Sequence, residues 1–165
     1  DSAAIQIPAP EDTPDESEDK TKRPSPVRQA TGTIGEATVT IEYGSPSVKG
    51  RKIWGDLVPF GEIWRTGANE ATTINVSKAV MVEGQSLPAG KYALFTIPNK
   101  DNWVIIFNKN ADQWGNYDYD QNLDALRVEV KPMPLDQSVE ALEFSVENGQ
   151  VVLKWEKMGV AFKIS

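Results

Sequence analysis

The chain has 165 residues, a net charge of −7 and a pI of about 4.7, and it contains neither His nor Cys. The missing side chains exclude Ser-His-Asp triads, Cys proteases, disulfides and zinc sites built on His or Cys. The acidic balance argues against a nucleic-acid partner, because binding a polyanion requires a clustered basic face. No apolar run approaches about 18 residues, so the sequence predicts no transmembrane segment.

Residues 1–30 differ in composition from the rest of the chain. They contain five of the eleven Pro, no aromatic side chain, and seven acidic against four basic groups. Such a segment buries too little apolar surface to offset the entropy lost on ordering. We therefore expect a disordered, acidic and Pro-rich tail, either a tether or a frayed terminus. Because the chain begins with Asp1 rather than Met, we also expect that an upstream segment has been removed.

From residue 31 onward, short strands separated by turns account for most of the pattern. Alternation of apolar and polar residues is typical of a strand with one buried face. The unbroken apolar run 103–107 predicts a strand that is buried on both faces, and Asn148-Gly149 is a strong hairpin signal. Helical spacing is scarce, with room for a turn at 50–57 and at 135–142. The expected strands are 38–43, 72–76, 78–82, 91–98, 103–107, 126–131, 141–147, 150–156 and 160–164.

This series of strands predicts an all-β domain over residues 31–165. The expected architecture is a two-sheet antiparallel β-sandwich with little helix, and a jelly roll made of the same parts is the variant. Two connections are much longer than the others, 44–71 and 108–124. Connections of this length in a compact domain usually carry function or cover an edge of the core. They are therefore the expected location of a site.

Four sequence blocks carry a family resemblance: GRKIWG at 50–55, WGDLVPFGEIWRTGANEATT at 54–73, LPAGKYALFTIP at 87–98 and DQWGNYDYD at 112–120. With them, residues 31–164 resemble the domain of unknown function family 2911, which is found in bacterial envelope and lipoprotein-type proteins. The resemblance implies a place in the periplasm or cell envelope, with a lipid anchor upstream of this chain. It implies no established reaction.

The first long connection contains a guanidinium, a carboxylate and several aromatic rings. Arg65 and Glu70 lie on either side of Gly67, where the chain can reverse and bring the two charges together. A guanidinium can bind a carboxylate or phosphate through two N–H groups. Alternatively, the Arg65–Glu70 pair is structural and joins the loop to the sandwich. In the functional interpretation, Arg65 and Asn69 form the floor of a pocket and Glu70 orients Arg65. The walls are formed by Trp54, Phe60 and Trp64.

The second long connection is rich in oxygen-bearing side chains. Ca²⁺ prefers such oxygens, so a calcium site is a possible cofactor site here. The EF-hand pattern is absent, however, and Asp and Asn also form turns and caps through bonds to nearby backbone. The alternatives stay open for Asn108, Asn110, Asp112, Asp118, Asp120 and Asp124.

Aromatic residues occur in both long connections. Sugar rings can pack their C–H faces on such rings, so they could form a platform for a glycan. Alternatively, the rings close the ends of the sandwich and bury large apolar areas. The residues concerned are Trp54, Trp64, Trp114, Tyr117 and Tyr119, whereas Trp103 and Trp155 lie in strands and are expected in the core.

Taken together, these features favour a non-catalytic envelope domain that binds a glycan or a peptide-like ligand between the two long connections. One alternative is a glycosidase-like hydrolase, which needs two carboxylates and could draw on Glu62, Glu70, Asp112 and Asp118. The other alternative is a purely structural or interaction module, in which the loops seal the end of the sandwich.

Overall fold

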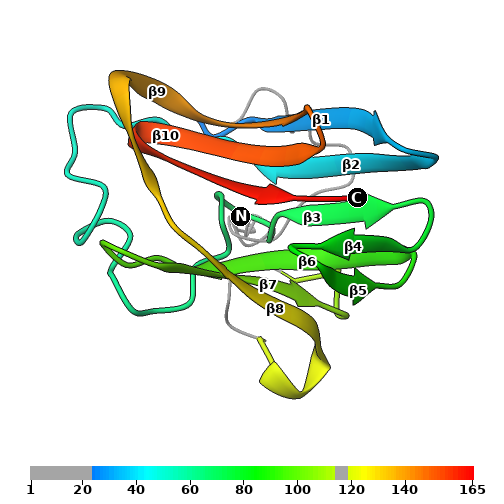
Figure 1. The fold of residues 1–165 in the computed structure, drawn as a ribbon. Coiled ribbons are helices and arrows are strands. Elements are labelled where there is room, and N and C mark those ends of the chain that lie inside the picture. The colour runs from blue at the N-terminus through cyan, green and yellow to red at the C-terminus, as the bar shows by residue number, and fades with distance from the viewer. Residues whose placement is uncertain (1–23, 114–118) are drawn as a thin grey trace, which may run out of the picture.

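The computed structural model describes residues 24–113 and 119–165. Within them, one six-stranded sheet has the order β1-β2-β3-β6-β7-β8, and two hairpins are formed by β9 with β10 and by β4 with β5 (Figure 1). Every pairing is antiparallel, which confirms the predicted fold class. The strands are β1 (Val27–Ile34), β2 (Ala37–Gly44), β3 (Thr73–Val76), β4 (Val80–Val82), β5 (Gln85–Leu87), β6 (Gly90–Ile97), β7 (Trp103–Asn108), β8 (Asp124–Val130), β9 (Met133–Glu147) and β10 (Gln150–Lys163).

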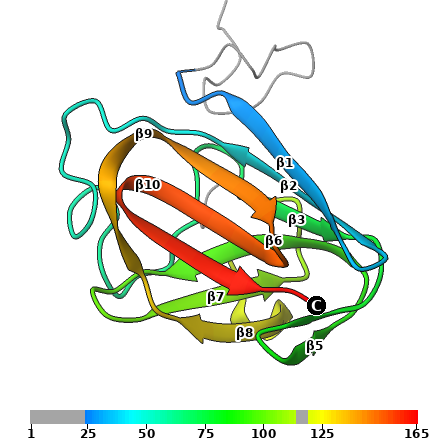
Figure 2. The same cartoon turned by 45° about the horizontal axis from the view of Figure 1, so that its top comes forward.

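The β9–β10 hairpin forms the second layer and lies across one face of the six-stranded sheet (Figure 2). Backbone hydrogen bonds extend this layer on both sides. At one edge, Met81 of β4 and Ser165 each donate an N–H to the other's carbonyl, at 2.8 and 2.9 Å. At the other edge, Val48 N donates to Glu140 O at 2.9 Å. The chain beside Val48 opens the first long connection, so the start of that loop is fixed to the second layer.

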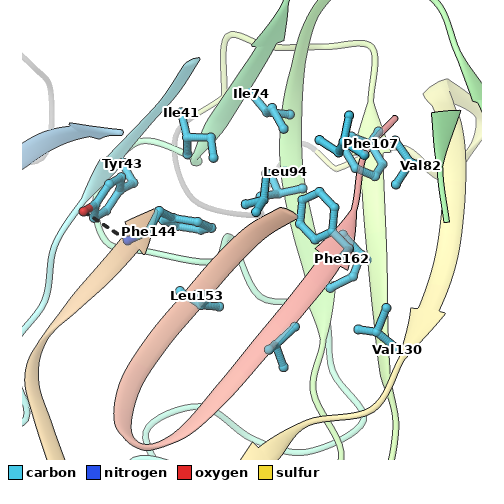
Figure 3. Close-up of a cluster of buried hydrophobic side chains, with 14 of the residues drawn as sticks. Ile41, Tyr43, Ile74, Val82, Leu94, Phe107, Val130, Phe144, Leu153 and Phe162 are labelled. Atoms are coloured by element: carbon cyan, nitrogen blue, oxygen red, sulfur yellow. Dashed lines mark hydrogen bonds between the residues drawn. The ribbon is translucent and has the colours of Figure 1, made fainter. Parts of the chain in front are cut away.

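The main core fills the space between the two layers (Figure 3). The alternating pattern of β2 predicts this strand correctly because polarity follows burial. Val39, Ile41 and Tyr43 are buried, while Thr38 and Glu42 are exposed. The layers also share a polar contact: Phe144 N of β9 donates to the Tyr43 hydroxyl at 3.2 Å (Figure 3). Burial of this continuous apolar core is the main term that stabilises the sandwich.

Strand β7 is buried on both faces, as its apolar run predicts. Trp103, Ile105 and Phe107 belong to the main core, whereas Ile106 belongs to a smaller cluster. The smaller cluster also contains Phe95 and lies on the outer face of the six-stranded sheet. It includes Ile63 and Tyr119, one from each long connection. The two long connections therefore cover the outer face of the central strands.

Three expectations about local structure need correction. The stretch 135–142 is not a helical turn but part of β9, because exposed polar side chains on a strand give no clear period. The two strands expected at 150–156 and 160–164 form one bent strand, β10, with register shifts around Glu156. The turns at 50–57 contain no helix.

Strand β1 is an element that the pattern analysis missed. It pairs along its whole length with β2, from Val27 opposite Gly44 to Ile34 opposite Ala37. Its sequence, VRQATGTI, is mostly polar because β1 is the edge strand of the sheet. Residues 27–30, which composition assigned to the tail, thus belong to the folded part. Residues 1–23 lie outside the described part, where the expectation of a disordered tail stays a prediction. No helix among the described residues is long and apolar enough to cross a membrane.

Candidate functional site

The first long connection continues the six-stranded sheet for one residue before it reverses. Trp64 and Thr96 of β6 exchange backbone hydrogen bonds, at 2.8 and 3.0 Å. This antiparallel bridge fixes the backbone on both sides of the Trp64 ring. The following residues, 65–71, then cross the end of the sheet.

Four tryptophan rings meet at this end of the sandwich. Trp54 lies edge-on to Trp64, Trp103 and Trp155, with ring centroids 5.7, 5.3 and 5.9 Å apart. Trp64 stacks on Trp155 at 6.0 Å with an interplanar angle of 15°. Trp103 and Trp155 are buried core residues, as predicted from their strands, and the two loop rings pack against them. Each such ring pair adds roughly 0.5–1.5 kcal/mol beyond its buried area.

The rings expected to act together lie on opposite faces of the six-stranded sheet. Trp54 and Trp64 pack against the main core, whereas Tyr119 packs on the outer face, with its ring centroid 5.0 Å from that of Phe95. Trp114 and Tyr117 fall outside the described residues. Among the rings that the structure places, those of the two long connections therefore form two separate groups.

The reversal at residues 65–69 has an unusual backbone. Thr66 has φ +63° and is 0% exposed, and Asn69 has φ +66°. A β-branched residue in this left-handed region costs of order 1–3 kcal/mol and persists only where its surroundings hold it. Here the Thr66 hydroxyl donates to Trp64 O at 3.1 Å, and the Thr72 hydroxyl donates to Thr66 O at 2.9 Å. The segment is thus held in one strained conformation.

Close backbone approach also requires glycine at Gly44. Ala68 N donates to Gly44 O at 3.1 Å, and a Cβ at Gly44 would collide with the carbonyl oxygen of Ala68. The end of β2 therefore determines where the reversal lies.

A hollow of about 320 Å³ opens beside Arg65. We call it the arginine hollow. It contains three of the predicted site residues, Trp64, Arg65 and Asn69, and no acidic side chain lines it among the described residues. The lining is formed by Ser25, Pro46, Arg51, Leu57, Val58, Trp64, Arg65, Gly67, Ala68, Asn69 and Trp155.

Arg51 is a lining residue that the sequence analysis missed. Its Nη2 donates to Ser47 O at 2.6 Å and its Nε donates to Val48 O at 3.1 Å. These bonds hold the guanidinium against the backbone of the loop. Arg51 forms no ion pair with any residue that the structure describes. The only sequence signal is its place in the block GRKIWG, because spacing does not reveal that residues 51 and 65 line the same hollow.

Glu70 lies in a second hollow rather than in the arginine hollow. This second hollow, which we call the sheet hollow, is also about 320 Å³ and lies over the outer face of the six-stranded sheet. The hypothesis that Glu70 orients Arg65 stays a prediction. The lining is formed by Val27, Glu42, Tyr43, Gly44, Glu70, Ala71, Thr73, Lys91, Ala111, Asp112 and Gln113.

The comparison with protein families matches residues 25–164 to the family described as "Protein of unknown function (DUF2911)". The chain belongs to this family. This confirms the resemblance that the four sequence blocks carry. The comparisons with curated proteins and with solved structures found no match.

The second long connection of this DUF2911 domain is organised by hydrogen bonds of its own polar side chains. Asn108 Nδ2 donates to Asp124 Oδ1 at 2.9 Å and to Asp120 O at 3.0 Å, while the Asp120 side chain caps a 3₁₀ turn, η2 (Gln121–Leu123), at Asn122 N. Among the described residues, no group of three acidic side chains could hold a metal ion. Asp118 lies outside them, and the calcium site stays a prediction.

Tyr119 connects this loop to β8. Its hydroxyl donates to Asp124 Oδ2 at 2.6 Å and accepts from Arg127 Nη2 at 2.8 Å, while Arg127 Nε also donates to Asp124 Oδ2 at 2.8 Å. Burial, together with the hydrogen bond to the Asp124 carboxylate, raises the pKa of Tyr119 to about 12. The hydroxyl therefore stays protonated in the folded domain and acts as a structural donor.

This raised pKa predicts a loss of stability in alkali. A folded-state pKa above the ordinary value of 10.0 means that the stabilising contribution is complete below pH 10 and is lost between pH 10 and about 12. Burial also raises the pKa of Tyr43 and of Tyr92, so part of the decline belongs to them. Melting temperatures measured against pH should fall less steeply in this range for Tyr119→Phe than for the wild type. Equal slopes would contradict the assignment to Tyr119.

Proposed function

We propose that this domain binds a glycan or peptide-like ligand through a carboxylate, in the arginine hollow, and catalyses no reaction. The observation that carries the proposal is the charge of the lining. Arg51 and Arg65 line the same hollow, and no acidic side chain lines it in the described part of a chain whose net charge is −7. A guanidinium can hold a carboxylate through two parallel hydrogen bonds, which provides both energy and orientation.

The apolar part of the lining supports an organic ligand rather than a simple ion. Trp64 and Trp155 line the hollow together with Leu57 and Val58. Ligand sites of this kind combine apolar and aromatic walls with a few polar groups that fix the orientation. The half-buried Trp64 ring and the exposed Leu57 side chain offer a surface to the C–H face of a sugar or to an apolar side chain of a peptide.

The shape of the hollow is also held in advance of binding. Asn69 Nδ2 donates to Ser25 O at 3.3 Å, the Thr66 backbone is locked in its strained conformation, and Arg51 is tied to the carbonyls of Ser47 and Val48. A site that is ordered before binding loses less conformational entropy when the ligand arrives. Backbone strain that the surroundings maintain is common at ligand sites.

The proposal includes the envelope location and the upstream lipid anchor, for which the family resemblance is the support. It favours binding over His- or Cys-dependent catalysis because the chain has no His or Cys. Of the carboxylates considered for a hydrolase, Glu70 and Asp112 line the sheet hollow, whereas Glu62 is exposed.

Matched ligand pairs test the proposal. Calorimetric titration should detect binding of a uronic-acid oligosaccharide but not of its neutral hexose counterpart, or of a peptide with a free carboxyl terminus but not of its amide. The pair in which only the acidic member binds also shows whether the ligand is a glycan or a peptide. Equal binding within both pairs, or no binding by any acidic ligand, would reject the carboxylate as the recognised group.

A further inference from the structure

The sheet hollow has the opposite charge pattern to the arginine hollow. Carboxylates reach its lining from three different elements: Glu42 from β2, Glu70 from the first long connection and Asp112 from the second. A single ammonium, Lys91 of β6, accompanies them. The lining therefore attracts a cation, although acidic side chains alone would not define a site.

Gln113 supplies an independent indication of a ligand. This lining residue is only 5% exposed. Its Nε2 donates to Asn108 Oδ1 at 3.1 Å and to Asn110 O at 2.6 Å, which fixes the orientation of the amide. Its Oε1 is buried and accepts no hydrogen bond from the part of the chain that the structure describes. Because a buried carbonyl without a donor is costly, such an oxygen usually has a partner.

The arrangement suits an organic ammonium better than a metal ion. A metal ion needs several oxygens converging on one point, and no group of three acidic side chains among the described residues meets that condition. An ammonium group instead has three N–H donors that bond in separate directions. One donor can satisfy a single carbonyl while carboxylates farther away stabilise the charge.

We propose that the sheet hollow is a second binding site, which takes a primary ammonium group such as that of an aliphatic amine or a lysine side chain. Gln113 Oε1 accepts one N–H of the ligand. Glu42, Glu70 and Asp112 supply the negative potential, and Lys91 opposes it. This site is independent of the arginine hollow, so either proposal can fail without the other.

Titration of the whole chain with cadaverine, followed by NMR, tests the site, with the uncharged pentanediol as the matched probe. Glu42→Gln and Asp112→Asn should each weaken cadaverine binding roughly two- to fivefold, as expected for exposed charge pairs. Lys91→Gln should tighten it by a similar factor. Glu147→Gln makes the same charge change on an exposed residue that does not line the hollow, and it should have no effect.

Substitution of an acidic lining residue and substitution of Lys91 should change the affinity for cadaverine in opposite directions, so the variants give a decisive result. The proposal is overturned if pentanediol binds as well as cadaverine, if Glu147→Gln weakens binding as much as Glu42→Gln does, or if cadaverine does not bind. Binding of Ca²⁺ that cadaverine cannot displace would also overturn it. A melting curve of each variant verifies that the domain is still folded.

Discussion

Replacement of Trp103 by Ala is expected to lower the free energy of unfolding by about 3–5 kcal/mol, the range for removing a large aromatic side chain from a core. Trp103 is 1% exposed, and its ring lies 5.3 Å from that of Trp54 and 6.3 Å from that of Trp64. The substitution removes the base on which both loop rings pack. Since a domain of this size has a total stability of about 5–15 kcal/mol, urea denaturation should show a large fall in the midpoint.

Leu57→Ala is the comparison, because Leu57 is an apolar residue of the first long connection but is 46% exposed. It should change the free energy of unfolding by no more than about 0.5 kcal/mol. If Trp103→Ala costs no more than Leu57→Ala does, the four rings are not packed as the structure has them.

The second large effect is expected on binding. Arg65→Gln should lower the affinity for the acidic ligand about 10- to 100-fold, because a hydrogen bond to a charged group contributes roughly 1.5–3 kcal/mol. Arg51→Gln should weaken it less, since Arg51 is more exposed than Arg65. Lys52→Gln is the control: it removes the neighbouring positive charge from a residue that does not line the hollow, and it should leave the affinity nearly unchanged.

Thermal melting of the same variants separates binding from a structural role. If Arg65→Gln lowers the melting temperature and the wild type binds no acidic ligand, the loop serves to seal the sandwich. The packing of Trp54 and Trp64 on buried Trp103 and Trp155 is the observation that supports this alternative.

Much of the β-sandwich was predictable because its central strands bury alternate residues. The pattern in β2 and the continuous apolar run in β7 report burial directly, since each side chain's polarity matches the face on which it lies. The pattern does not identify a strand where that relation is weak. Strand β1 is an edge strand with exposed polar side chains, and the first half of β9 is largely exposed as well.

The candidate site was predictable only in part. Trp64, Arg65 and Asn69 were singled out because they are close in sequence and lie in an irregular segment. Arg51 was not, because its place in the same hollow depends on the path of the whole loop and on the attachment of that loop to β9. Glu70 lies beyond the reversal at Thr66 and lines the sheet hollow instead. The left-handed backbone of Thr66 is a conformation that no propensity favours for a β-branched residue.

NMR titration with the acidic ligand selected in the binding assays is the most direct test of the arginine hollow. The indole Nε1–H signals of Trp64 and Trp155 should shift during the titration, in proportion to occupancy, and the shifts should disappear in Arg65→Gln. Signals of residues around Tyr119, on the outer face of the sheet, should stay in place. Shifts confined to the outer face, with both indole signals unchanged, would contradict binding in the arginine hollow.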